Sequence, residues 1–256
     1  MTILNLDPPS TPLPASAKSP PSPVAAASEV ELVLARFRLL ASRRAAWLQH
    51  LWSQDTAANG NGAVSHAEVA EILADRESPA PEQKCMAAHE PAREWAAEMA
   101  EIERALAAVA NSRFARLAQI FGLSPADLDL LQACASLAWD PPLARVAAYL
   151  HDQASRAYLT ESLAARLYGQ GRSGLWPAAS ALFGWELVRV RESDPGEPRA
   201  LECDPQIRDW LRGHPVLDAS LAGFVRPQPP RPPLTHWPVD ACAGWLEQVL
   251  RDDPSV

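Results

Sequence analysis

The side chains best suited to catalysis or metal binding are scattered through this 256-residue sequence. Its six histidines fall in different predicted elements, and the adjacent His151 and Asp152 form only a weak candidate pair of imidazole and carboxylate. No CxxC or Cys/His spacing typical of a zinc site occurs among the four cysteines, Cys85, Cys134, Cys203 and Cys242. We therefore expect no metal, no cofactor and no catalytic group, with reduced, buried thiols in a cytoplasmic protein.

The sequence also lacks the motif of a nucleotide-binding site. A phosphate-binding loop of the form GxxxxGK[ST] needs a lysine that reaches the β- and γ-phosphates. The sequence has no such loop, and its only lysines are Lys18 and Lys84. The sequence therefore predicts a binding or regulatory module without an ATPase site.

The charge balance limits the classes of partner. With 23 Lys and Arg against 31 Asp and Glu, the formal net charge is −8. Affinity for DNA comes mainly from cations that displace counterions from phosphates, so a general nucleic-acid binder is not expected. The sequence also lacks an apolar run of about 18 residues and a signal-peptide pattern, so we expect no membrane contact.

Two amphipathic helices are predicted in the first half of the chain. A Pro-rich tail, residues 1–27, predicts disorder, and Ser28 then caps a helix to about Trp52. A second helix is expected from near Glu90 to Gly122. Their apolar residues repeat every three or four positions, which predicts a coiled-coil-like helical hairpin over 28–121, or alternatively two ordinary core helices of a bundle. The first stripe comprises Val30, Val33, Phe37, Leu40, Trp47 and Leu51, with Arg44 at the missing position.

The next region, residues 122–224, has the element order of a winged helix. Helix starts at Ser124, Asp140 and Thr160 are followed by a short helix over 177–183, two strands around a turn, and a closing helix after Asp204. A Pro-rich linker, residues 225–238, and a C-terminal helix, residues 239–256, complete the chain. The predicted fold class is therefore mainly α, with a long helical hairpin followed by a winged-helix domain that carries a small antiparallel β-hairpin.

These segments resemble a known family. The stretches FGLSPADLDLLQACASLAWDPPLARVAAYLHD, YLTESLAARLYG, ALFGWELVRV and LECDPQIRDWLRGHPVLDASLAGF resemble the variant winged-helix domain ahead of the ATPase core in bacterial AAA-type ATPases. Such ATPases are associated with contractile injection systems. The ATPase core itself has no counterpart in this chain. The resemblance implies either the front part of such an ATPase or a stand-alone relative that has lost the motor.

Arginines of the winged-helix region are candidate partner contacts. Arg166 lies on the helix after Thr160, and Arg189 and Arg191 lie on the wing. Between residues 122 and 224, nine arginines face thirteen acidic residues, so the local net charge is −4. This balance favours protein contact over reading of DNA bases.

The tryptophans divide into two groups. Trp95, Trp139, Trp185 and Trp210 fall on apolar stripes and are predicted to be core. Three others lie in a loop, the linker and the last helix, where aromatic anchors of an interface are one interpretation and intramolecular packing is the other. These three are Trp176, Trp237 and Trp245.

The function that the resemblance implies is a non-catalytic protein-interaction and regulatory region of an AAA-type ATPase that serves a contractile injection system. Its expected partners are a protein of that system or other subunits. The alternative is a winged-helix transcriptional regulator that binds DNA. A third possibility is a homo-oligomer held by the stripe between residues 30 and 51.

Overall fold

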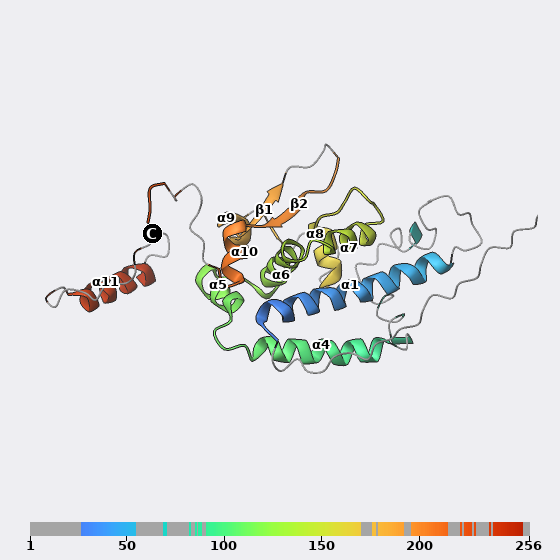
Figure 1. Ribbon diagram of the computed structural model, residues 1–256, viewed down its shortest axis with the longest axis horizontal. Coiled ribbons are helices and arrows are strands. Elements are labelled where there is room, and N and C mark those ends of the chain that lie inside the picture. Colours follow the sequence, from blue (N-terminus) through green and yellow to red (C-terminus); the bar gives the residue numbers. More distant parts are fainter. Residues whose placement is uncertain are drawn as a thin grey trace, which may run out of the picture. The chain divides into compact units, whose positions relative to one another are not determined.

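The computed structural model gives an order of mainly helical elements with one pair of strands (Figure 1). It divides into two compact units, Met1–Pro215 and Val216–Val256. The structure describes residues 27–54, 69–70, 82, 85, 87–88, 91–169, 176–177, 179–191, 196–214, 221, 223–226, 228, 236 and 238–252. The predicted tail at 1–27 therefore lies outside the described residues, apart from Ala27, as does most of the predicted linker at 225–238.

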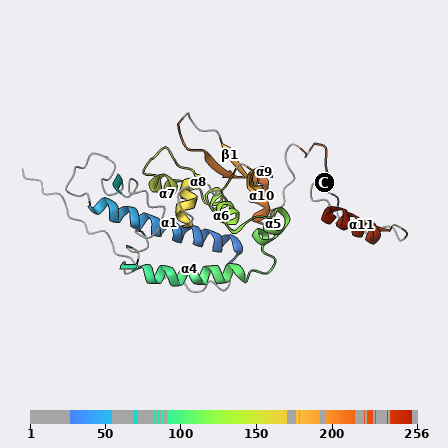
Figure 2. The ribbon, with the colours of Figure 1, turned by 180° about the vertical axis from the view of Figure 1, so that it is seen from behind.

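Helices α1 (Glu29–Gln54) and α4 (Ala92–Ala107) pack side by side and antiparallel (Figures 1 and 2). Near the end of α1, Trp47 and Leu51 pack against Trp95 at the start of α4. At the opposite end, the Glu29 carboxylate accepts hydrogen bonds from the Ser112 hydroxyl at 2.5 Å and the Arg113 amide at 3.0 Å. The predicted antiparallel pair of helices is therefore present.

The second predicted helix is shorter than expected. It ends at Ala107, and a separate helix α5 (Arg113–Phe121) follows. Asn111 between them has a φ of 58°, a left-handed conformation that interrupts a helix. The Ser112 hydroxyl then accepts a hydrogen bond from the Ala115 amide and so caps α5. The sequence analysis missed this break because the apolar spacing continues across it.

Helix α1 is a core helix and not one of two helices in an isolated hairpin. Besides α4, it contacts three helices of the winged-helix region, α6 (Pro125–Trp139), α7 (Leu143–Leu150) and α8 (Glu161–Leu167). Phe37 and Val33 belong to the same buried cluster as Leu130 and Leu163. The bundle interpretation therefore describes α1 better than a coiled-coil seam, and residue 121 does not separate two cores. The stripe considered for pairing with a second copy is covered by this chain's own helices.

Arg36 of α1 joins four helices through one side chain. Its guanidinium donates hydrogen bonds to Asp129 at 2.7 Å and Gln132 at 2.8 Å, both on α6. The same group lies 3.8 Å from Glu103 of α4 and 4.9 Å from the ring centre of Tyr168, which caps α8. With only 17% of its side chain exposed, Arg36 neutralises Asp129 inside the bundle.

The remaining elements of this unit complete the winged helix. A short helix α9 (Ala181–Gly184) precedes the antiparallel strands β1 (Val188–Arg191) and β2 (Ala200–Cys203), and α10 (Pro205–Leu211) closes the order. Val188 pairs with Cys203 and Arg191 with Ala200. An isolated bridge between Leu159 and Leu201 adds a third stretch of chain beside β2. The predicted fold class is confirmed, and α9 contacts β1, as the predicted order of a short helix before the strands implies.

Three of the predicted helix starts are confirmed, whereas the one at Asp140 is wrong, because Asp140 is the C-cap of α6 and α7 begins at Leu143. Ser124 and Asp127 form a reciprocal capping box at the start of α6. Thr160 accepts a hydrogen bond from the Leu163 amide, and Asp204 accepts two from the first turn of α10. Because such caps satisfy amides that have no partner within the helix, they fix the ends of short helices.

The second unit holds one described helix, α11 (Val239–Asp252). Trp245 and Leu246 on this helix are 64% and 51% exposed. Across the described residues of both units, no helix is long and apolar enough to cross a membrane.

Candidate functional site

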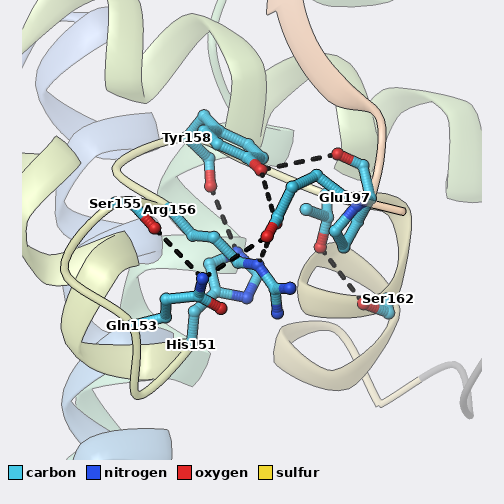
Figure 3. Close-up of polar contacts among 9 residues, drawn as sticks. His151, Gln153, Ser155, Arg156, Tyr158, Ser162 and Glu197 are labelled. Carbon is cyan, nitrogen blue, oxygen red and sulfur yellow. Dashed lines mark hydrogen bonds and ion pairs between the residues drawn. The ribbon is translucent and has the colours of Figure 1, made fainter. Parts of the chain in front are cut away.

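The wing is attached to the loop that follows α7 by a cluster of polar side chains (Figure 3). Glu197, on the returning arm of the wing, accepts a hydrogen bond from Arg156 Nε at 2.6 Å. The Gln153 amide lies 3.5 Å from the same carboxylate and donates to the Ser155 hydroxyl at 3.1 Å. Because Arg156 is positively charged and donates to Glu197, it holds the pKa of that carboxyl below its usual range.

Tyr158 continues this attachment. Its hydroxyl lies 3.5 Å from both the Glu197 carboxylate and the Pro198 carbonyl. The Arg191 guanidinium of β1 lies 5.9 Å from the centre of the tyrosine ring. Since the neighbouring Leu159 forms a bridge with β2, backbone and side chains together fix this loop against the wing.

His151 supports the cluster from below the loop. Its Nε2 donates to the Tyr158 carbonyl at 3.2 Å, and the two rings are 6.2 Å apart. Burial lowers the pKa of His151, and the positive charges of Arg156 and Arg166 add to that effect, while Glu197 and the hydrogen bond oppose it. The charge of Arg166, a predicted partner contact, therefore acts on the pKa of His151. His151 therefore supports the loop through its hydrogen bond to Tyr158, and burial favours its neutral form.

The two predicted arginines of the wing are both held by carboxylates. Arg189 lies 2.6 Å from Asp204 and 3.7 Å from Glu186. Arg191 lies 3.3 Å from Glu202 on the paired strand. Both arginine side chains remain more than half exposed. The wing therefore presents balanced charge, in which each of these two cations is matched by a carboxylate of the same surface.

The three tryptophans considered as partner contacts have different outcomes. Trp176 is 4% exposed, and its indole N–H donates to the Ala126 carbonyl at 3.1 Å. The intramolecular interpretation therefore applies to Trp176, because burial leaves no surface for a partner. Trp245 is exposed on α11, in the second unit. Trp237 lies outside the described residues.

Trp185 is an exposed aromatic residue that the sequence analysis assigned to the core. It follows α9, is 66% exposed, and lies 5.7 Å from the ring of Phe121 at the end of α5. Ile120, which precedes Phe121 on α5, is 59% exposed. The apolar pattern around Trp185 concealed this position, since the tryptophan lies on the turn before β1 and not on a buried strand. Its exposure makes Trp185 a better candidate contact than Trp176.

The cysteines are partly as expected. Cys134 and Cys203 are buried, and burial raises the pKa of both thiols, that of Cys203 to about 12. Cys85 is half-buried and Cys242 is exposed, so the expectation of burial was wrong for these two. Among the residues that the structure describes, no group of His, Cys, Asp and Glu side chains could hold a metal ion. The local chemistry of the wing cluster is therefore charge pairing that holds a loop and a hairpin together.

Comparison with known proteins identifies the domain. A family model described as "Winged helix domain, variant" matches residues 26–225. A search of curated proteins and a search of solved structures give no significant match. The matched range includes α1 and α4 as well as the wing, in agreement with the core that these elements share. The chain therefore belongs to the variant winged helix domain family.

Proposed function

We propose that this chain is a non-catalytic protein-interaction and regulatory region of an AAA-type ATPase that serves the assembly or function of a contractile injection system. A winged-helix domain supports a role in binding either DNA or protein. In this proposal the surface formed by the wing and Trp185 contacts a protein, and the bound state is passed to a motor.

The observation that carries the choice of protein over DNA is the pairing of the wing arginines. Phosphate contacts need cations that are free to displace counterions. Arg189 and Arg191 instead lie against Asp204 and Glu202, so a DNA phosphate would have to displace a carboxylate at each position. An exposed tryptophan beside such a mixed surface is typical of protein interfaces, where aromatic residues are enriched.

The link to an ATPase rests on the sequence resemblance and on the order of segments. The winged helix is followed by the Pro-rich residues 225–238 and then by α11, the order that the resemblance implies ahead of a motor. We further propose that the chain itself neither binds nor hydrolyses ATP, since it lacks a phosphate-binding loop.

Two titrations by calorimetry test this function. At low ionic strength, where phosphate contacts are strongest, we expect no heat of binding with Mg–ATP or with duplex DNA. Salt-dependent binding of DNA that weakens in Arg189→Ala or Arg191→Ala would favour a transcriptional regulator instead. Binding of ATP would contradict the non-catalytic assignment.

Sequencing the gene beyond the Val256 codon tests the ATPase link. A following strand and a GxxxxGK[ST] loop would establish the front part of an ATPase. A stop codon would instead favour the stand-alone relative.

A further inference from the structure

A hollow of about 440 Å³ lies between the end of α1 and the loop that follows α7. Trp52 of α1 and Tyr149 of α7 line it, and their rings meet nearly at right angles, at 76° with 5.3 Å between the ring centres. Ala148, Ala154 and Ala157 add apolar lining. The hollow therefore has two aromatic side chains at a corner and the size of a site for a small molecule.

Two side chains of opposite charge line the same hollow. Arg145 and Asp152 are both exposed, and within the described part of the chain neither side chain takes part in an ion pair. The Arg156 guanidinium of the same loop, by contrast, lies 2.6 Å from Glu197. A ligand with one positive and one negative group would therefore find a partner for each of them in the hollow.

Asp152 is unfavourable at its position for two local reasons. Its amide donates a hydrogen bond to the Tyr149 carbonyl, and the next amide donates to that of Ala148, both at 3.0 Å, which is a Schellman motif. Glycine is usual at the left-handed residue of this motif, and Asp152 occupies it with a φ of 52°. A carboxylate here also lies beside the negative end of the helix dipole, where a cation is favoured. Residues that depart from local preferences in this way are concentrated at functional sites.

We propose that this hollow binds a small zwitterion, with a quaternary ammonium group between the Asp152 carboxylate and the rings of Trp52 and Tyr149, and a carboxylate against Arg145. Aromatic rings and a carboxylate both attract organic cations. The apolar lining favours a quaternary ammonium over a primary one, since its methyl groups need no hydrogen-bond acceptors. Arg145 repels a cation and Asp152 repels an anion, so a ligand that carries both groups fits best.

The hollow borders the attachment of the wing. Gln153 lines it, and the side-chain amide of this residue also donates to Ser155 and lies 3.5 Å from Glu197 (Figure 3). A ligand in the hollow therefore contacts the loop that holds the wing.

Isothermal titration calorimetry of the full chain with three matched probes tests the site. The zwitterion is γ-butyrobetaine, 5,5-dimethylhexanoate has carbon in place of its ammonium nitrogen, and butyltrimethylammonium has a methyl group in place of its carboxylate. At low ionic strength we expect a dissociation constant of about 1 mM for the zwitterion and at least about fivefold weaker binding of the other two. Each of these two probes lacks one of the two charge contacts.

Two substitutions separate the two charge contacts. Asp152→Asn should weaken the zwitterion at least about fivefold and leave 5,5-dimethylhexanoate no weaker, because it removes only the contact with the cation. Arg145→Gln should weaken both of these probes and leave butyltrimethylammonium no weaker. The charge-matched controls are Glu98→Gln on α4 and Arg116→Gln on α5, at exposed positions outside the hollow, and they should change the binding of none of the three.

Thermal unfolding shows whether the Asp152 carboxylate serves binding or the fold. Asparagine tolerates the left-handed conformation and carries no charge, so Asp152→Asn should keep the unfolding temperature or raise it. Loss of affinity without loss of stability is expected of a residue kept for binding.

Four results would overturn the proposal. The first is no heat of binding with γ-butyrobetaine up to about 10 mM. The second is equal affinity for the zwitterion and 5,5-dimethylhexanoate, and the third is an Asp152→Asn variant that binds the zwitterion as tightly as the unchanged protein. The fourth is a lower unfolding temperature of Asp152→Asn, which would make the carboxylate part of the fold. The probes include neither ATP nor DNA, so these results are separate from the test of the proposed function.

Discussion

Helix α1 and the wing are attached to the same helices in different ways. Phe37 and Leu48 of α1 are almost fully buried in the shared core, and Arg36 adds a largely buried ion pair. The wing has buried residues at its base, such as Val188, but its outer part is held by the half-exposed Arg156–Glu197 pair. Solvent screens such pairs, so they contribute little to global stability. The first helix is therefore part of the core, while the outer wing is held by a partly exposed ion pair.

The largest loss of stability should follow from truncating the Phe37 side chain of α1. Replacing Phe37 with alanine removes a ring that is 0% exposed, and we expect a loss of about 3–5 kcal/mol in the free energy of unfolding. Urea denaturation followed by tryptophan fluorescence and circular dichroism measures it. Gln49→Ala, an exposed change on the same helix, is the control. Two separate transitions in the wild-type protein would show that α1 is not part of the common core.

Two arginines of α1 offer a matched pair for the next effect. Arg36 and Arg38 each lie 2.7 Å from a carboxylate, but their side chains are 17% and 56% exposed. Arg36→Met removes the cation that contacts the partly buried Asp129 and should cost about 2 kcal/mol, whereas Arg38→Met should cost under about 0.5 kcal/mol. Thermal or urea unfolding of both variants gives the comparison. Equal losses would mean that burial does not distinguish the two pairs.

Loosening of the wing should be local. Glu197→Gln removes the charge that Arg156 contacts, so amide hydrogens of β1 and β2 should exchange faster. The global unfolding temperature should change by no more than about 2 °C, as for other screened pairs. Hydrogen exchange by mass spectrometry separates the two quantities. A large drop in unfolding temperature would instead make the wing part of the global core.

The smallest effect should appear on acidification. The pKa of His151 is lowered from 6.5 in the folded protein, so folding favours its neutral form. The contribution of His151 to the free energy of unfolding is therefore fully present above about pH 6.5, and it is lost as the pH drops toward the lower pKa of the folded state. His151→Gln should reduce this slope of unfolding free energy against pH between 6.5 and 5. An unchanged slope would show that His151 is not the group responsible.

Much of the fold could be predicted from the sequence because local signals were strong. Capping residues such as Ser124, Thr160 and Asp204 mark helix starts, and the alternation after Trp185 marks the first strand. The apolar stripe of α1 predicted a helix with a buried face but not what covers it. Periodicity alone does not distinguish a coiled-coil seam from a core helix, and so the domain boundary at residue 121 was misplaced.

The candidate site was harder to predict because it depends on contacts distant in sequence. Arg156 and Glu197 are 41 residues apart, and no motif links them. The sequence predicted Arg189 and Arg191 as contacts but not the carboxylates that hold them. Trp185 was expected in the core and is exposed, and Trp176, for which both interpretations were open, is buried, because an apolar pattern indicates burial only where the element's orientation is known.

Native-state hydrogen exchange at Phe37 and Leu130 tests most directly the claim that α1 and the winged helix form one core. Both residues are fully buried, the first in α1 and the second in α6. We expect their amides to exchange with the same free energy, close to that of global unfolding, and with the same dependence on denaturant. A lower free energy at Phe37, with Leu130 still protected, would contradict a common core.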